Sequence, residues 1–243
     1  MKPIFKKLES AEYILQNKRI DIWQYPLHTQ FVGAEELLHE DELVRARRFH
    51  FTRHQRRFTV GRAMLRRILA RYLHLSPLEL VFSYNQHGKP QLDNDPSLQF
   101  NLSHSGDLAL LAIGKHFSLG VDVEYFSARP YEGIGKNLFS PMENKGLHQT
   151  SAMLKPLAFF HIWSQKEAFI KACGLGLAYP TQQFDVAILP PTNQPCIDTL
   201  HQQPWQITSF MPQVACNAAL CHHPDIEEIH YFTFLKCDPY EKI

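Results

Sequence analysis

Residues 120–124 read GVDVE, a short run in which apolar and acidic residues alternate. The alternation predicts a β-strand that extends over residues 119–125. Side chains on a strand point to opposite faces in turn, so Asp122 and Glu124 would share one face while Val121 and Val123 point inward. Two interpretations stay open at this point: the exposed polar face of an ordinary strand, or two carboxylates within reach of one ion.

Residues 163–177 read WSQKEAFIKACGLGL and form a second stretch with chemical interest. We predict a helix over residues 156–173, with Pro156 in its first turn and a stop at residues 174–176. On this helix Glu167 and Lys171 lie four residues apart and share a face, in the order that favours an ion pair. By itself, the spacing is also typical of a solvated surface pair.

The flanking sequence predicts a mixed α and β protein. Residues 52–55 have the form of a capping box before apolar residues spaced three or four apart, which predicts a helix over about residues 53–73. Residues 45–71 contain ten arginines and no acidic residue. The apolar runs predict strands at 80–84, 98–101, 108–113, 184–189, 205–210, 214–220 and 231–235, with loops at 103–106 and 190–195. Two lobes would meet near residues 115–120.

Length and composition restrict the class of protein. With 243 residues, 44% of them hydrophobic, the chain can bury one large core or the cores of two lobes. The net charge of +1 argues against bulk binding to nucleic acid or anionic lipid, and no apolar run approaches the roughly 20 residues that span a membrane. The first ten residues lack the apolar segment of a signal peptide, and the five cysteines form no CxxC pair. We therefore expect a cytoplasmic protein with reduced thiols.

The carboxylates of Asp122, Glu124 and Glu167 have no histidine or thiolate among them. They are hard oxygen ligands, which suit Mg²⁺ better than zinc. Magnesium usually completes its shell with water and with phosphate oxygens of a substrate, so such a site requires anion-binding groups around it. Candidates are Lys171, Lys89 in the turn at residues 87–90, Ser103 and His104 in the polar loop, and the arginines of residues 45–71. Each has a plain structural explanation on its own, but their joint occurrence favours a functional site.

In this order and spacing, the segments resemble the Sfp-type 4′-phosphopantetheinyl transferases. The resemblance is carried by residues 48–66, 87–90, 100–105, 120–124 and 163–177, and the last two at their separation are the most specific. It implies an α+β fold of two similar α+β lobes related by a pseudo-two-fold axis, residues 1–117 and 118–243. Coenzyme A and Mg²⁺ would bind in the cleft between the lobes.

The resemblance also implies an activity, namely Mg-dependent transfer of the 4′-phosphopantetheine arm from coenzyme A to a serine of an apo acyl or peptidyl carrier protein. Adenosine 3′,5′-bisphosphate would be released. The partner would be an acidic carrier protein, and the enzyme a monomer that binds neither nucleic acid nor membrane.

The resemblance assigns roles to individual residues. Asp122, Glu124 and Glu167 fall on the metal-ligand positions, and Asp122, Glu167 and Lys171 would be catalytic. Glu167 is also the candidate base for the carrier serine, but a metal-bound carboxylate is a weaker base, so we prefer its ligand role. The implied coenzyme A contacts are Arg45, Lys89, Pro90, Asn101, Ser103, His104 and Lys171.

Two positions depart from the family pattern. Glu42 stands where a second basic residue is expected, three positions before Arg45, and Phe58 stands where a small hydroxyl residue sometimes lies near the adenine. The contacts to the 3′-phosphate are therefore open, and the other arginines available for them are Arg48, Arg53, Arg56 and Arg57.

Other interpretations compete with the resemblance. The arginine run would suit a nucleic-acid-binding module, although the near-neutral charge opposes it. The carboxylates would suit a phosphohydrolase or a nucleotidyl transferase, but both leave residues 163–177 and Lys89 without a role. An inactive family member is disfavoured because Asp122, Glu167 and Lys171 are all present. A zinc site at Cys216, Cys221, His222 and His223 matches no common ligand spacing.

Overall fold

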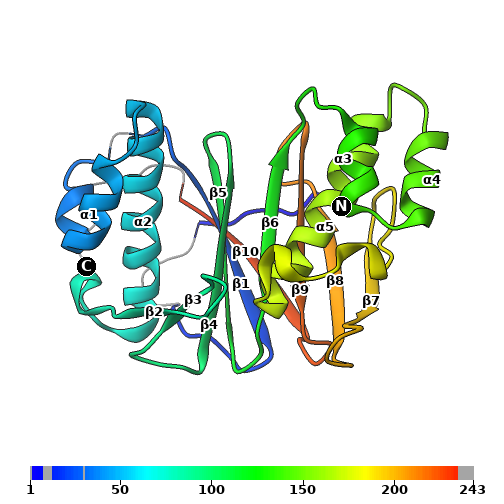
Figure 1. The fold of residues 1–243 in the computed structure, drawn as a ribbon. Coiled ribbons are helices and arrows are strands. Elements are labelled where there is room, and N and C mark those ends of the chain that lie inside the picture. Colours follow the sequence, from blue (N-terminus) through cyan, green and yellow to red (C-terminus); the bar gives the residue numbers. More distant parts are fainter. Residues whose placement is uncertain (1, 8–12, 30, 235–243) are drawn as a thin grey trace.

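The computed structural model describes residues 2–7, 13–29 and 31–234 (Figure 1). The first half contains β1 (Arg19–Pro26), α1 (Glu40–Arg47), α2 (Thr52–Leu73), β2 (Phe82–Tyr84), β3 (Pro90–Leu92), β4 (Leu98–Ser105) and β5 (Leu108–Lys115). The second half contains β6 (Gly120–Tyr125), α3 (Tyr131–Leu138), α4 (Pro141–Gln149), α5 (Lys155–Cys173), β7 (Asn193–Ile197), β8 (Pro204–Phe210), β9 (Cys216–His222) and β10 (Glu228–Thr233).

The same connectivity occurs in both halves. One sheet has the strand order β10-β1-β5-β4 and the other β6-β9-β8-β7. The opening strand of each half pairs antiparallel with the closing strand, β1 with β5 and β6 with β9, and the closing strand also pairs with β4 or β8. A long helix, α2 or α5, lies between the opening strand and this hairpin in the sequence. The repetition confirms the predicted fold of two similar α+β lobes.

The two sheets pack face to face, and alternate residues of the strands between them are buried on opposite sides. In β5, Leu108 and Leu110 contact the second sheet, whereas Ala109 and Leu111 belong to the core under α2. Both faces of the strand are therefore covered, which explains its continuous apolar sequence. The layers follow the order α2, first sheet, second sheet, α5, and Figure 1 shows the two long helices on the outer sides of the sheets.

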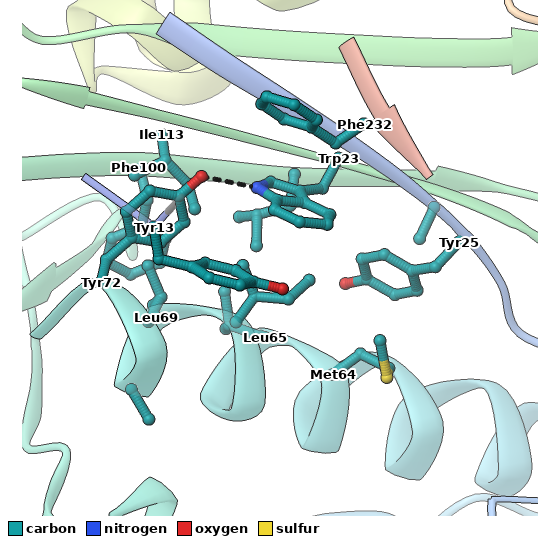
Figure 2. Packing of buried hydrophobic residues seen from close by; sticks show 14 of the residues in the cluster. Tyr13, Trp23, Tyr25, Met64, Leu65, Leu69, Tyr72, Phe100, Ile113 and Phe232 are labelled. Atoms are coloured by element: carbon teal, nitrogen blue, oxygen red, sulfur yellow. Dashed lines mark hydrogen bonds between the residues drawn. The ribbon is translucent and has the colours of Figure 1, made fainter. Parts of the chain in front are cut away.

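An aromatic cluster fills the core between α2 and the first sheet (Figure 2). The Tyr13 ring stacks on Trp23 with 5.4 Å between centroids, and the Trp23 indole Nε1 donates to the Tyr72 hydroxyl at 2.9 Å. Tyr72 in turn donates to the buried Asp21 carboxylate at 2.7 Å. The polar tips of the aromatic side chains are thus satisfied inside the core, as burial requires.

The last described strand crosses back to the first lobe. β10 pairs in parallel with β1, from Arg19 opposite Glu228 to Gln24 opposite Thr233. The chain therefore passes between the lobes twice, once at residues 116–119 and once at residues 223–227. Phe117 of the first crossing stacks on His223 of the second, with 4.1 Å between ring centroids. The division at residue 117 stays a prediction, and one strand of the second half completes the first sheet.

Most predicted elements are confirmed, with shifted ends, but the strand at residues 184–189, the cap at residue 52 and parts of the loops at residues 103–106 and 190–195 are wrong. Residues 184–189 form no strand, because side chains of α4 and α5 take up their backbone groups: Glu143 accepts from the Val186 amide and Lys166 donates to the Phe184 carbonyl. Thr52 is the first residue of α2 and not a side-chain cap. Part of the predicted loop at 190–195 belongs to β7, and the predicted strand end at residue 235 lies outside the described residues.

Candidate active site

Strand β6 presents its carboxylates to α5. Val121 and Val123 point into the core between the two sheets, which leaves Asp122 and Glu124 on the opposite face, as the alternation predicts. Gly120 permits a very close approach of β6 to α5, because a Cβ atom at this position would lie 2.1 Å from the Ala168 carbonyl oxygen. The two elements are therefore in backbone contact beside the carboxylates.

A three-residue hydrogen-bonded group lies where β4, β6 and α5 meet. The Lys171 ammonium donates to Asp122 Oδ1 at 2.6 Å and to Ser103 Oγ at 3.0 Å, and Ser103 Oγ donates to the same Oδ1 at 2.9 Å. Asp122 is 4% exposed and Ser103 is 6% exposed. Buried hydrogen bonds of this kind to a charged group are the strong ones, so the group is fixed in place.

Glu124 lies at the more open end of the same strand face. Its Oε2 accepts from Ser105 Oγ at 2.9 Å, and Ser105 Oγ accepts from the Tyr125 amide at 3.1 Å. Burial raises the pKa of Glu124, and the neighbouring Asp122 charge adds to the rise. The site therefore concentrates negative charge in partly desolvated surroundings.

Glu167 lies one helical turn before Lys171 and is an electrostatic neighbour of both β6 carboxylates. The pKa of Glu167 is raised to about 7: burial raises it most, the charges of Asp122 and Glu124 also raise it, and Lys171 partly offsets the rise. A carboxyl with this environment is close to its midpoint at neutral pH. A carboxyl pKa that is shifted this far, beside a charged partner, is typical of functional sites.

The donors present fit a hard cation, although they do not form a closed cage. Within residues 2–7, 13–29 and 31–234, no group of three His, Cys, Asp or Glu side chains is arranged to hold a metal ion. One buried oxygen of Asp122, Oδ2, has no hydrogen-bond partner. An unpartnered carboxylate oxygen beside two further carboxylates that repel it suits a divalent cation bound by oxygen ligands.

Ser103 and His104 lie on strand β4 together with Asn101, so the predicted loop at residues 103–106 is wrong for residues 103–105. The reason is pairing: Ser103 lies opposite Leu110 and His104 opposite Ala109 in the β4–β5 ladder. Asn101 Oδ1 accepts from the Val121 amide at 2.8 Å, so Asn101 joins the lobes.

The His104 side chain lies on the opposite face of β4 from Ser103 and keeps contact with solvent. Partial desolvation lowers the pKa of His104, and the positive charges of Lys171 and Arg57 lower it further. These effects favour the neutral imidazole, and the nearby Asp122 charge only partly opposes them.

Lys89 lies at the end of the turn between β2 and β3, directly before Pro90, the first residue of β3. Its ammonium donates to Ser118 Oγ at 2.7 Å and to the carbonyls of Leu119 and Ala172 at 3.1 Å each. Burial lowers the pKa of Lys89 to about 8. Its ammonium is thus engaged with protein groups at the end of α5.

Arg45 is not brought into this group. It is exposed on α1, where its guanidinium lies 5.2 Å from the centroid of the Phe58 ring, and Figure 1 places α1 on the far side of α2 from β6. Glu42, the departure three positions earlier, is buried and accepts from Arg62 Nε and Arg66 Nε at 2.6 Å each. Although burial opposes it, the two guanidiniums lower the pKa of Glu42.

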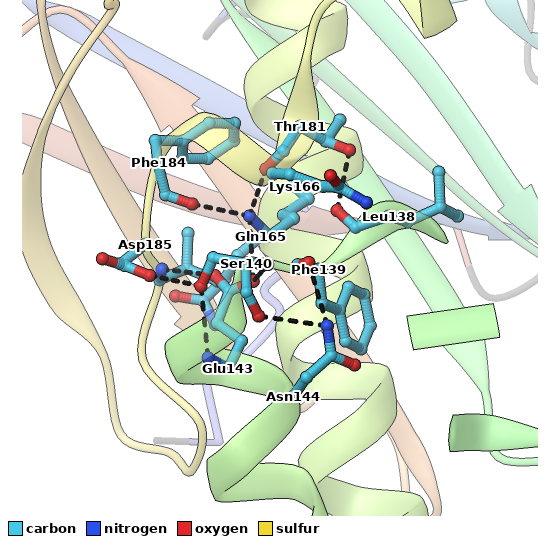
Figure 3. Close-up of polar contacts among 12 residues, drawn as sticks. Leu138, Phe139, Ser140, Glu143, Asn144, Gln165, Lys166, Thr181, Phe184 and Asp185 are labelled. Atoms are coloured by element: carbon cyan, nitrogen blue, oxygen red, sulfur yellow. Dashed lines mark hydrogen bonds and ion pairs between the residues drawn. The ribbon is translucent and has the colours of Figure 1, made fainter. Parts of the chain in front are cut away.

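Two supporting parts of the site were not predicted. Ser105 shares a strand face with Asn101 and Ser103, so the period-two pattern of residues 98–105 would have found it. The second part is Lys166, whose ammonium is buried behind α5 and donates to the carbonyls of Thr181 and Phe184 at 2.5 and 2.7 Å (Figure 3).

Lys166 also forms an ion pair with Glu143 of α4, at 3.0 Å between Nζ and Oε2. Glu143 in turn accepts from the Ser140 and Val186 amides, at 2.8 and 2.7 Å (Figure 3). This network anchors the helix that carries Glu167 and Lys171.

The disfavoured zinc site does not form. Cys216 points into the core between the sheets, whereas Cys221, five residues along β9, points into the core under α5. Side chains on opposite faces of a strand cannot ligate one ion.

Comparisons with known proteins identify the family. Residues 21–116 match a family model described as 4′-phosphopantetheinyl transferase, N-terminal, and residues 118–219 match that of the 4′-phosphopantetheinyl transferase superfamily. The 4′-phosphopantetheinyl transferase HetI of Nostoc sp. is 37% identical over 215 residues, which cover 85% of this chain and 88% of that protein. Sfp of Bacillus subtilis is 29% identical over 193 residues, covering 76% and 82%. The chain therefore belongs to the 4′-phosphopantetheinyl transferase superfamily and is a transferase.

Proposed function

We propose that this enzyme transfers the 4′-phosphopantetheine arm of coenzyme A to a serine of an apo acyl or peptidyl carrier protein, with Mg²⁺, and releases adenosine 3′,5′-bisphosphate. The observation that carries the proposal is the bonding of Lys171 to Asp122 and Ser103 in a chain of this transferase family. A cation, a carboxylate and a hydroxyl at one junction suit a phosphate-containing substrate.

We assign the Mg²⁺ ligands to Asp122, Glu124 and Glu167. The unpartnered Oδ2 of Asp122 supports this assignment, as do burial and the charges of the neighbouring carboxylates, which together raise the pKa values of Glu124 and Glu167. When bound, Mg²⁺ would neutralise charge on the diphosphate and fix its geometry.

The remaining groups would bind and orient the diphosphate. Breaking a phosphoanhydride requires stabilisation of charge on the phosphoryl oxygens and in-line placement of the incoming hydroxyl. The Lys171 ammonium supplies positive charge, and Ser103, which accepts from Lys171 and donates to Asp122, would supply its hydroxyl donor by exchanging the bond to Asp122 for one to the substrate. His104, on the opposite face of β4 from Ser103, would contact coenzyme A outside this group, with its imidazole favoured in the neutral form.

The proton of the carrier serine needs an acceptor, and the midpoint of Glu167 near neutral pH supports a role for it. A metal-bound carboxylate is a weaker base, so the ligand role of Glu167 remains the preferred one. The two roles separate in the pH profile of Glu167→Gln. Residual activity with an unchanged acidic limb would remove Glu167 as the titrating base.

Charge supports an acidic carrier as the protein partner. Arg45, Arg48, Arg53 and Arg56 are exposed or half-exposed around the start of α2, and none forms an ion pair among those seen in the described part of the chain. A positive rim of this kind steers acidic partners at low ionic strength. Transfer that is insensitive to salt would contradict the steering.

We also propose that the enzyme is a monomer and works in the cytoplasm, where thiols stay reduced. All the proposed ligands of one site come from a single chain, and the four described cysteines are free thiols. None of the helices in the described residues is long and apolar enough to cross a membrane.

The decisive experiment is the intact mass of an apo acyl carrier protein after incubation with this enzyme, coenzyme A and Mg²⁺. We expect a gain of one phosphopantetheine group and no gain with Asp122→Ala. A Lys136→Ala variant on the exposed face of α3 serves as the matched control, and it should transfer like the natural enzyme. Absence of transfer to both an acyl and a peptidyl carrier would contradict the proposal.

A further inference from the structure

The turn between β2 and β3 crosses from the first lobe to the end of α5. Its residue Lys89 bonds to three acceptors that lie outside the first lobe's sheet: Ser118 Oγ, the Leu119 carbonyl and the Ala172 carbonyl. Ser118 Oγ also donates to the Ala172 carbonyl, at 2.7 Å. One ammonium thus joins the turn, the first crossing between the lobes and the last turn of the helix.

These bonds use the whole donor capacity of the side chain. A lysine ammonium has three donors, and all three find acceptors within the protein. The Ala172 carbonyl belongs to the last turn of α5, where carbonyl groups lack helical partners and the helix end is negative. A half-buried cation at this point stabilises the helix end. It would have to leave one of these acceptors in order to contact a phosphate.

Asn85 ties the same turn to the same helix end. Its Oδ1 accepts from the amides of His87 and Lys89 at 2.9 Å each, which shapes the turn. Its Nδ2 donates to the Gly174 carbonyl at 2.8 Å, directly after α5. A Cβ atom at Gly174 would lie 3.2 Å from Asn85 Nδ2 and 3.3 Å from Lys89 Cδ, so glycine permits this close contact.

We propose that Asn85 and Lys89 form a clamp that positions α5 against β6, so that Lys171 meets Asp122. Lys171 directly precedes Ala172, whose carbonyl the clamp holds, and Glu167 lies one turn earlier on the same rigid helix. In this role Lys89 is a positioning residue. The inference rests on the proposed active site, and it differs from the expectation that the Lys89 ammonium contacts coenzyme A directly.

The two roles of Lys89 predict different kinetics. Displacement of a catalytic group by about 1 Å costs roughly 10²-fold in turnover, whereas loss of a substrate contact that is equal in the ground and transition states raises only KM. We expect Lys89→Met to lower kcat about 10²-fold, with the KM for coenzyme A changed less than about threefold. A tenfold rise in KM with kcat unchanged would overturn the proposal.

Asn85→Ala provides a second variant that removes only one bond across the lobes. We expect kcat to fall about tenfold. The double variant Asn85→Ala/Lys89→Met should lose less kcat than the product of the two single losses, because both side chains hold the same end of α5. The matched control is Gln86→Ala in the same turn, whose exposed side chain contacts only His87 among the described bonds. Equal kcat values for Asn85→Ala and Gln86→Ala would contradict the clamp.

Hydrogen exchange tests the clamp without any turnover, and so separates its failure from failure of the proposed function. We expect the amides of residues 170–174 to exchange at least tenfold faster in Asn85→Ala than in Gln86→Ala, because the helix end loses its anchor. Unchanged exchange in both Asn85→Ala and Lys89→Met would refute the clamp even in an enzyme that modifies carriers.

Discussion

Gly120→Ala is the sharpest test of how this fold builds its site. The added Cβ would lie 2.1 Å from the Ala168 carbonyl oxygen, 2.4 Å from the Ala172 amide nitrogen and 2.9 Å from the Lys171 carbonyl carbon. All three are backbone atoms of α5, so no side-chain rotation relieves the contact. The strand and the helix must separate by about 1 Å, since real Cβ atoms essentially never approach closer than 3.0 Å.

The magnitude follows from two opposing terms. Replacing glycine by alanine reduces the entropy of the unfolded chain and stabilises by about 0.4–1 kcal/mol where the backbone permits. Overpacking in a close-packed interior costs about 1–3 kcal/mol and occasionally more. We expect a net loss of about 2 kcal/mol, which lowers the melting temperature by about 4–8 °C in a chain of this size. Turnover should fall about 10²-fold, because Lys171 moves away from Asp122.

The assay pairs thermal denaturation with the carrier-modification rate, and Gly61→Ala is the matched control. The same methyl group added at Gly61, inside α2, would lie 3.7 Å from Leu27 Cδ2, an ordinary contact. There the better helix propensity of alanine should raise stability by up to about 1 kcal/mol and leave turnover unchanged. A Gly120→Ala enzyme with the natural melting temperature and natural turnover would refute the close approach of β6 and α5.

Three further predictions concern other parts of the molecule. Lys166→Met leaves Glu143 buried without its partner and should cost about 3–5 kcal/mol in urea denaturation, with partial recovery in the double variant Lys166→Met/Glu143→Leu. Burial lowers the pKa of His161 to about 4, so the unfolded state takes up its proton first as pH falls below about 6.5. Stability should therefore decrease between pH 6.5 and pH 4, by up to about 3 kcal/mol, and His161→Asn should flatten this slope. Arg45→Gln should raise the KM for coenzyme A about tenfold at unchanged kcat if Arg45 binds the 3′-phosphate; an unchanged KM would move that role to another arginine.

Local sequence patterns predicted the elements that carry the candidate site. Alternation at residues 119–125 indicated the strand, and Pro156 together with the glycine stop at residues 174–176 indicated the helix; these bring Asp122, Glu167 and Lys171 into one electrostatic environment. Such patterns could not predict that the Lys89 ammonium is used within the protein, because the acceptors come from residues 118, 119 and 172. Contacts between distant segments depend on how the lobes dock, and no local pattern specifies them.

The elements that periodicity missed have one of two physical causes. β1 is covered on both faces, with Ile22 toward the second sheet and Trp23 toward α2, so it lacks the polar alternation of a half-exposed strand. The helices α1, α3 and α4 have eight or nine residues each, too short for a clear period. Conversely, residues 184–189 alternate well, but the buried Lys166 and Glu143 bind their backbone groups instead of a neighbouring strand.

The pseudo-two-fold relation explains why the carboxylates of the candidate site lie in only one lobe. Asp21 is the third residue of β1 and faces α2, as Asp122 is the third residue of β6 and faces α5. In the first lobe both oxygens of Asp21 are satisfied, by Arg19 at 2.8 and 3.0 Å and by the Tyr72 hydroxyl at 2.7 Å, and the group is fully buried. In the second lobe one oxygen of Asp122 lacks a partner.

The aspartate at the same strand position is therefore fully hydrogen-bonded in the first lobe. In the second lobe it keeps one carboxylate oxygen that can still bind a ligand. Trp23 completes the closed network by donating to Tyr72 from within the strand, whereas Glu124 occupies the matching position two residues after Asp122. The Trp23 indole donates a hydrogen bond to a neighbouring polar group. The Glu124 carboxylate instead adds negative charge, which a bound cation can offset. On this face of the opening strand, the aromatic residues of the first lobe build a hydrophobic core. The acidic residues at the matching positions of the second lobe build the candidate site.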